Sequence, residues 1–298
     1  MKKLVILVAV ALTAAAAAGR TASADTIPFP SPHAGDIFVI AQTVTKDCVM
    51  SDYFAPGSSV VFRAYAVDGK TRKVLTAKDV VYFYVKIPTQ ASIKLKATPR
   101  GACASGQYSW TGTWNVPADY PTGVAPFKVL VKSKAKRTGS FVQMPVVTSQ
   151  LTISTTPNIP SGPGPSAPAG PSGKVSAVIY ADSVNGTRPA GTAPRPIGCT
   201  QTNVFKRGEQ FVLRVFGYDL TTRQVLSIDN VSEAHFTVPG QPNVTLNWGS
   251  HGPLKVFFWA NQWQIPKDYA LGNTTVRIVF TLTSGKTATH DYPITVIP

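Results

Sequence analysis

Apolar and polar side chains alternate with a period of two over much of the chain beyond residue 35. The segments 59–67, 80–85, 210–216 and 275–281 also contain many β-branched and aromatic residues, a combination typical of strands with one buried face. Turn-forming sequences, such as Ala55-Pro56-Gly57, recur at intervals of about 8–12 residues. No segment keeps a helical spacing for three turns. The pattern therefore predicts an all-β protein in which short strands form two-sheet sandwiches.

The second half of the chain repeats the strand pattern of the first half. Residues 48–88 align with residues 199–239 without a gap, at a constant offset of 151. Farther along, the patterns Trp-x-x-x-Trp and Pro-x-Asp-Tyr-x-x-Gly recur after a length difference of two residues. A repeat of this extent predicts two copies of one domain, which we assign to residues 35–155 and 174–298. Residues 156–173 are rich in Pro, Gly and Ser and predict an extended linker, so we expect each copy to fold on its own.

The first 24 residues have the features of a signal peptide. Lys2 and Lys3 precede an apolar run of about 15 residues, and Ala22-Ser23-Ala24 matches the small-x-small site that signal peptidase cleaves. The run is shorter than the roughly 20 apolar residues of a spanning helix. We therefore expect export to the periplasm or the extracellular space, a mature chain that begins at Asp25, and no transmembrane anchor. Residues 25–34 form a short Pro-containing leader before the first domain.

One segment in each copy resembles a known motif. Residues 114–123 read WNVPADYPTG, and residues 263–272 read WQIPKDYALG. Both resemble the Trp/Phe-x-Ile/Val-Pro-x-x-x-Pro-x-Gly-x-Tyr corner of bacterial immunoglobulin-like and macroglobulin-type modules, where a strand crosses from one sheet to the other. The resemblance implies two tandem immunoglobulin-like β-sandwich domains joined by the Pro/Gly-rich linker. Such modules serve adhesion, spacing and carbohydrate contact, so the resemblance implies no reaction.

The residues that recur in both copies have a structural interpretation. The repeated tryptophans stand four residues apart, on one face of a strand: Trp110, Trp114, Trp259 and Trp263. We expect them in the core, although an exposed pair could instead stack on a sugar. The repeated charges include one arginine on an inner strand and one aspartate in the corner, namely Arg63 with Asp119 and Arg214 with Asp268. We expect these to form Arg–carboxylate contacts, because no nucleophile or second acid recurs with them.

The three cysteines predict one disulfide and one remaining thiol in an exported protein. Cys48 and Cys199 occupy the same repeat position, and Cys103 aligns with Gly252. We expect a Cys48–Cys103 disulfide, which would place Cys199 near His251 in the second copy. Cys199 could then be a buried thiol or pair with another chain. Alternatively, Cys199 and His251 could bind a soft metal such as copper or zinc. No other cofactor is expected.

An excess of positive charge points to anionic partners. The chain carries a net charge of +15, with 15 basic and 6 acidic residues in 36–155 but 11 and 7 in 174–298. This excess favours polyanions, although it could also be an ordinary solvated surface. The alternating lysines Lys132, Lys134 and Lys136 predict either an anion-contact ridge along a strand or a charged edge that prevents aggregation. Trp248 replaces Ala97 of the first copy, and we expect it near a hairpin tip as a possible ligand contact.

These features favour an exported, non-catalytic protein over an enzyme. The sequence lacks the H-E-x-x-H, G-x-S-x-G and CxxCH motifs and a phosphate-binding Gly loop, which would have indicated specific chemistry. The leading hypothesis is a binding and spacer protein that contacts an anionic envelope polymer, a glycan or a protein partner. No specific nucleic acid is expected as a partner. The alternative is an accessory protein of a metal or redox complex that uses Cys199 and His251.

Overall fold

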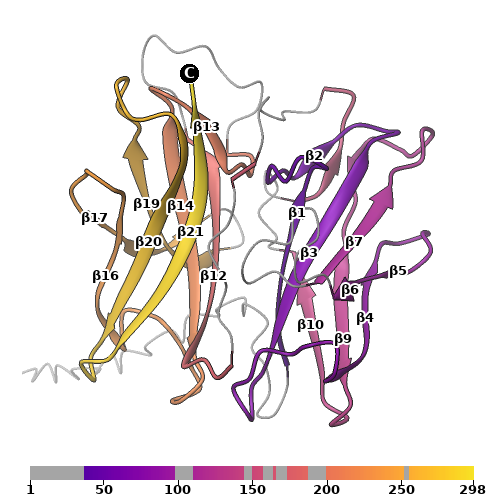
Figure 1. Cartoon of the computed structure of the whole chain (residues 1–298), viewed down its shortest axis with the longest axis horizontal. Helices are drawn as coiled ribbons and strands as arrows, with labels where there is room; N and C mark the ends of the chain where they lie inside the picture. The colour runs from indigo at the N-terminus through magenta and orange to yellow at the C-terminus, as the bar shows by residue number, and fades with distance from the viewer. Residues whose placement is uncertain are drawn as a thin grey trace, which may run out of the picture.

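The described residues form two β-sandwiches, which lie side by side in Figure 1. The computed structural model describes residues 37–97, 110–143, 150–156, 164–165, 173–186, 199–251 and 255–298. The predicted signal peptide, the leader, most of the linker and Cys103 lie outside these residues. In the described part of the chain, no helix is long and apolar enough to cross a membrane.

The first half contains two four-stranded antiparallel sheets and one small sheet. The first sheet has the order β1 (Ile37–Val44), β3 (Ser59–Asp68), β7 (Trp110–Asn115) and β6 (Lys96–Ala97). The second sheet has the order β10 (Thr138–Val142), β9 (Lys128–Ser133), β4 (Val80–Lys86) and β5 (Ile93–Lys94). The small sheet has the order β2 (Tyr53–Phe54), β11 (Thr152–Ile153) and β8 (Gly123–Val124).

The second half repeats this topology. Its first sheet has the order β12 (Ala177–Asn185), β14 (Gln210–Asp219), β19 (Val256–Gln264) and β18 (Asn247–His251), with β15 (Gln224–Val225) beside β14. Its second sheet has the order β13 (Val204–Lys206), β21 (Thr287–Ile297), β20 (Gly272–Leu282), β16 (Val231–Thr237) and β17 (Val244–Thr245). The repeat in the sequence is therefore also a repeat in the fold.

The repeated tryptophans lie in the two cores. All four side chains are buried: Trp110, Trp114, Trp259 and Trp263. The first of each pair donates its indole N–H to a backbone carbonyl, to Leu75 O at 3.3 Å and to Leu226 O at 2.6 Å. The second of each pair packs edge-on against the tyrosine of its corner, with ring centroids 5.0 Å and 5.1 Å apart. These contacts join the corner of each copy to its core.

Strands β1 and β12 are buried on both faces, because the two sandwiches pack against each other. Every residue of β1 is buried, as are all residues of β12 after its first. One face of each strand covers its own core, and the other face contacts the opposite half. Across this contact, the rings of Phe38 and Tyr218 lie 4.7 Å apart, and those of Phe141 and Tyr180 lie 6.2 Å apart. The halves thus share buried apolar surface, and the folding of each copy on its own stays a prediction.

Candidate functional site

The contact between the two halves is nearly symmetric. The backbone N–H of Met50 donates to Asn203 Oδ1 at 2.8 Å, and the backbone N–H of Gln201 donates to the Asp52 carboxylate at 3.1 and 3.2 Å. Met50 corresponds to Gln201 in the repeat, and Asp52 corresponds to Asn203. The backbone donors of the two halves therefore occupy equivalent positions in the repeat, and so do the side-chain acceptors. This reciprocity is the property of an isologous interface, in which one patch packs against its own copy.

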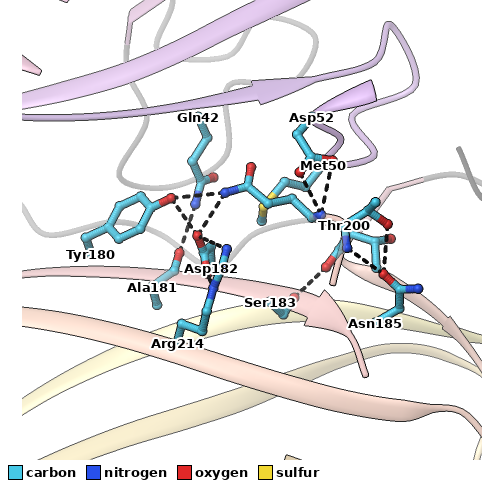
Figure 2. A network of polar contacts seen from close by, with 12 residues as sticks. Gln42, Met50, Asp52, Tyr180, Ala181, Asp182, Ser183, Asn185, Thr200 and Arg214 are labelled. Carbon is cyan, nitrogen blue, oxygen red and sulfur yellow. Dashed lines mark hydrogen bonds and ion pairs between the residues drawn. The ribbon is translucent and has the colours of Figure 1, made fainter. Parts of the chain in front are cut away.

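A network of polar contacts joins residues of the two halves, as Figure 2 shows. Asp182 is fully buried and accepts from Arg214 Nε at 2.6 Å and from Arg214 Nη2 at 2.8 Å. Its second oxygen also accepts from the Tyr180 hydroxyl at 2.9 Å and from Gln201 Nε2 at 2.8 Å. Four donors thus converge on one carboxylate, and a satisfied network of this kind specifies a single packing arrangement.

In the first half, an amide takes the place of the carboxylate in the equivalent pair. Arg63 donates from Nε at 3.2 Å and from Nη2 at 2.9 Å to Gln42 Oε1, and Gln42 Nε2 donates across the interface to Ala181 O at 3.0 Å. The strand register places Gln42 opposite Arg63, just as it places Asp182 opposite Arg214. The chain therefore has one charged and one uncharged partner for the same buried arginine.

The predicted pairing of these arginines with the corner aspartates is wrong. Asp119 and Asp268 lie in exposed turns, whereas Arg63 and Arg214 are buried and face the opposite half. The reason is that successive side chains of a strand point to opposite faces of the sheet. Each arginine therefore points away from its own core and contacts the residue opposite it, which lies on β1 for Arg63 and on β12 for Arg214. Sequence reasoning missed the interface, although the nearly unbroken apolar stretch 37–44 is the pattern of a strand buried on both faces.

Burial shifts the pKa of one carboxyl group at the interface. Asp52 is fully buried, and this burial raises the pKa of its carboxyl well above the ordinary value. The N–H of Gln201 and the charge of Arg214 act in the opposite direction but do not outweigh the desolvation. Desolvation of this carboxyl group penalises its charged form.

The predicted metal pair Cys199–His251 is not brought together. The N–H of Cys199 donates to Asn185 O at 2.9 Å, at the end of β12. Asn185 is paired with Phe211 on β14, which in turn is paired with Trp263 on β19. His251 pairs with Val256 at the opposite end of β19. These two positions of β19 are seven residues apart, or about 23 Å at ~3.3 Å per residue. The prediction rested on the alignment of Cys103 with Gly252. This alignment spans the two-residue length difference between the copies, so it does not establish which residues are paired on neighbouring strands.

The cysteines differ in state. Cys199 is a free, exposed thiol, whereas Cys48 is disulfide-bonded. Cys103 lies outside the described residues, so the Cys48–Cys103 pairing stays a prediction. The His251 ring stacks on Phe258 with centroids 4.0 Å apart, and burial, with the charge of Arg214, lowers its pKa. Among the described residues there is no group of three or more metal-ligating side chains.

The proposed lysine ridge is not a ridge along a strand. Lys132 lies on β9, but Lys134 and Lys136 lie in the turn that leads to β10. Lys136 has a φ of 62°, a left-handed conformation that belongs to a turn and not to a strand. Lys134 and Lys136 are therefore exposed at a hairpin tip, and the strand-like alternation of the lysines misled the interpretation.

Trp248 is also placed differently from the expectation. It lies on the edge strand β18, opposite Trp259 on β19, and not at a hairpin tip. Its half-buried ring lies 5.4 Å from that of Trp259 and 5.9 Å from that of Phe257. The ring thus packs against the second core at the edge of the sheet.

The second sheet of the first half carries an exposed basic and aromatic surface. We call this surface the tyrosine–lysine face, and it consists of Tyr82, Tyr84, Lys86, Lys94, Lys128 and Lys132. Residues directly opposite each other in an antiparallel ladder project from the same face. The pairs Tyr82–Lys132 and Lys86–Lys128 join β4 to β9, and Tyr84–Lys94 joins β4 to β5. The register therefore gathers these side chains from three strands.

The matching face of the second half lacks these groups. The six equivalent positions are Glu233, His235, Thr237, Thr245, Arg277 and Thr281. Its one basic residue of fixed charge, Arg277, donates to Asp291 from Nε at 2.8 Å and from Nη2 at 2.9 Å. Four of the 15 basic residues in 36–155 thus lie on a face whose equivalent in the second half has no lysine.

Comparisons with known proteins add only distant similarity. No family model matches the chain, and no curated protein matches it significantly. Fibronectin(III)-like modules of CbhA from Clostridium thermocellum share 11% identity over 87% of this chain and 94% of theirs, with a TM-score of 0.22. Domains 4–9 of the surface layer protein SbsC share 12% identity over 87% of this chain and 31% of theirs, with a TM-score of 0.23.

A third similar structure contains a bound glycan. The Bacteroides ovatus protein SGBP-B, in complex with a mixed-linkage heptasaccharide, shares 8% identity over 83% of this chain and 43% of its own, with a TM-score of 0.19. The chain thus spans less than half the length of this structure and of the SbsC structure. At these values the similarity concerns the β-sandwich fold alone.

Proposed function

We propose that this chain is an exported, non-catalytic binding and spacer protein that contacts anionic envelope polymers or glycans. The observation that carries the proposal is the tyrosine–lysine face. Four lysines and two tyrosines project from one exposed sheet face, and no acidic residue occurs on the four strands of that sheet. A surface of one charge sign attracts polymers of the opposite sign.

The packing of the two sandwiches supports the spacer role. The fully buried strands β1 and β12 and the reciprocal hydrogen bonds across the interface join the halves into one unit. A large apolar contact opposes relative motion of two domains. The protein would thus present its binding face on a support of constant shape, as a spacer requires.

Two features of the sequence support export. The first 24 residues have the layout of a signal peptide, and an oxidising compartment suits the predicted Cys48–Cys103 disulfide. The proposal therefore places the mature chain, beginning at Asp25, in the periplasm or outside the cell, where anionic envelope polymers are accessible.

Co-sedimentation with envelope material tests the proposal. The mature protein should sediment with purified anionic envelope polymers and remain in the supernatant with neutral glycans. Added salt should release it, because exposed charges are screened beyond a Debye length of about 8 Å at physiological ionic strength. Failure to bind any anionic polymer at low salt would contradict the proposal.

A further inference from the structure

We infer that the tyrosine–lysine face is a binding site for a linear polysaccharide that carries anionic groups on its sugars. The inference rests on the proposed function and deepens it, because it names the site and the class of ligand. The polymer would lie over β4, with its sugar rings against Tyr82 and Tyr84 and its anionic groups between the lysines of β5, β4 and β9.

The lysines are arranged in a way that costs stability without a bound anion. Lys86 and Lys128 are exposed and stand directly opposite each other across the ladder between β4 and β9, and like charges in this position destabilise a sheet. The nearest acidic residue in sequence, Asp79, precedes β4, and its carboxylate accepts from Thr76 N at 2.9 Å and from Thr76 Oγ1 at 2.6 Å. An anionic group between Lys86 and Lys128 would relieve their repulsion.

The tyrosines distinguish a sugar polymer from a simple polyanion. The rings of Tyr82 and Tyr84 are stacked, with centroids 5.4 Å apart and an interplanar angle of 23°, and both are partly exposed. A tyrosine ring combines an apolar surface with a hydroxyl that can donate and accept hydrogen bonds. The C–H faces of sugar rings need such a surface, whereas a chain of phosphates would use the lysines alone.

A nucleic acid could also use stacked aromatic rings and lysines. The signal peptide predicted from the first 24 residues would separate the mature protein from cellular nucleic acid, whereas it would bring the protein to envelope glycans. The observations therefore favour the polysaccharide, and single-stranded DNA becomes a competing outcome in the experiment.

The second half provides an internal control for this assignment. At the positions of Tyr82 and Tyr84 it has Glu233 and His235, and its Arg277 is already paired with Asp291. The same fold thus presents a face without exposed aromatic stacking or unpaired lysines. Substitutions on this second face should leave binding unchanged if the first face is the site.

Isothermal titration calorimetry on the mature full chain tests the inference with four probes. The probes are a polygalacturonate oligomer, its neutral methyl ester, polyphosphate and an oligothymidylate. The aromatic variant is Tyr82→Leu with Tyr84→Leu, which keeps apolar cover on the sheet, and the charge variant is Lys86→Gln with Lys128→Gln. The control variant is Glu233→Ala with His235→Ala, and thermal melting identifies any variant that has lost its fold.

We expect the wild type and the control variant to bind polygalacturonate at least about tenfold more tightly than its methyl ester. The charge variant should lose about tenfold in affinity for both polygalacturonate and polyphosphate. The aromatic variant should lose about tenfold for polygalacturonate only.

Three results would overturn the inference. They are wild-type affinity in a folded aromatic variant, loss of binding in the control variant, and tighter, tyrosine-dependent binding of oligothymidylate. If the inference fails but envelope polymers still co-sediment with the protein, the proposed function survives and the site lies elsewhere.

Discussion

Replacing Asp182 by alanine should strongly destabilise the protein. The carboxylate is fully buried and accepts two hydrogen bonds from Arg214, with further donors from Tyr180 and Gln201. The substitution would leave the guanidinium of Arg214, itself only 5% exposed, without its anion. A buried charge that loses its counterion cannot recover its lost hydration.

The magnitude follows from this burial. Removing one partner of a buried ion pair costs about 3–5 kcal/mol, a large part of the roughly 5–15 kcal/mol by which domains are stable. Asp182→Asn should cost less than Asp182→Ala, because an amide oxygen can still accept from the arginine. The first half demonstrates this arrangement, since Gln42 Oε1 accepts both hydrogen bonds from Arg63.

Urea unfolding followed by tryptophan fluorescence measures the effect. The matched control is Asp291→Ala. This substitution likewise removes a carboxylate that accepts two hydrogen bonds from an arginine, here Arg277 on the exposed face of the second half. That arginine side chain is 60% exposed, so solvent should replace the contact with little change in stability. The halves share buried surface, so each variant should unfold in a single transition.

Two results would refute this reasoning. If Asp182→Ala and Asp291→Ala change the free energy of unfolding equally, burial does not determine the strength of the contact. If Asp182→Ala unfolds only the second half and leaves the first half as stable as before, the interface does not join the two sandwiches.

Two further predictions concern the interface acid and the cysteines. Burial raises the pKa of the Asp52 carboxyl above its ordinary value of 3.8. The protonated carboxyl therefore contributes stability that is fully present below pH 3.8. This contribution is lost as the pH rises through the pKa of the folded state, by at most about 1.4 kcal/mol per pH unit. Asp52→Asn, which introduces the residue found at 203, should remove this part of the pH dependence in urea titrations; a constant difference between wild type and variant at all pH values would contradict it. Non-reducing peptide mapping should find a Cys48–Cys103 peptide, and Cys199 should react with a thiol reagent in the folded protein because it is exposed; a disulfide that contains Cys199 would exclude this pairing.

Local patterns were sufficient to predict the fold class and the repeat. Alternation with a period of two reports directly which side chains of a strand share a face, and the paired tryptophans therefore indicated the core of each copy. The same patterns could not identify partners across strands. Arg63 and Arg214 were assigned to corner aspartates because these were the repeated charges, whereas the register placed Gln42 and Asp182 opposite them.

The tyrosine–lysine face shows the same division. The sequence by itself determined that Tyr82, Tyr84 and Lys86 share one face of a strand, because they alternate along residues 80–86. Only the tertiary structure decided that Lys94, Lys128 and Lys132 join them, because these residues belong to other strands whose pairing depends on long-range contacts. The interface was likewise decided by the tertiary structure. The apolar stretch 37–44 indicates burial on both faces, but a local pattern contains no information on which distant surface covers a strand.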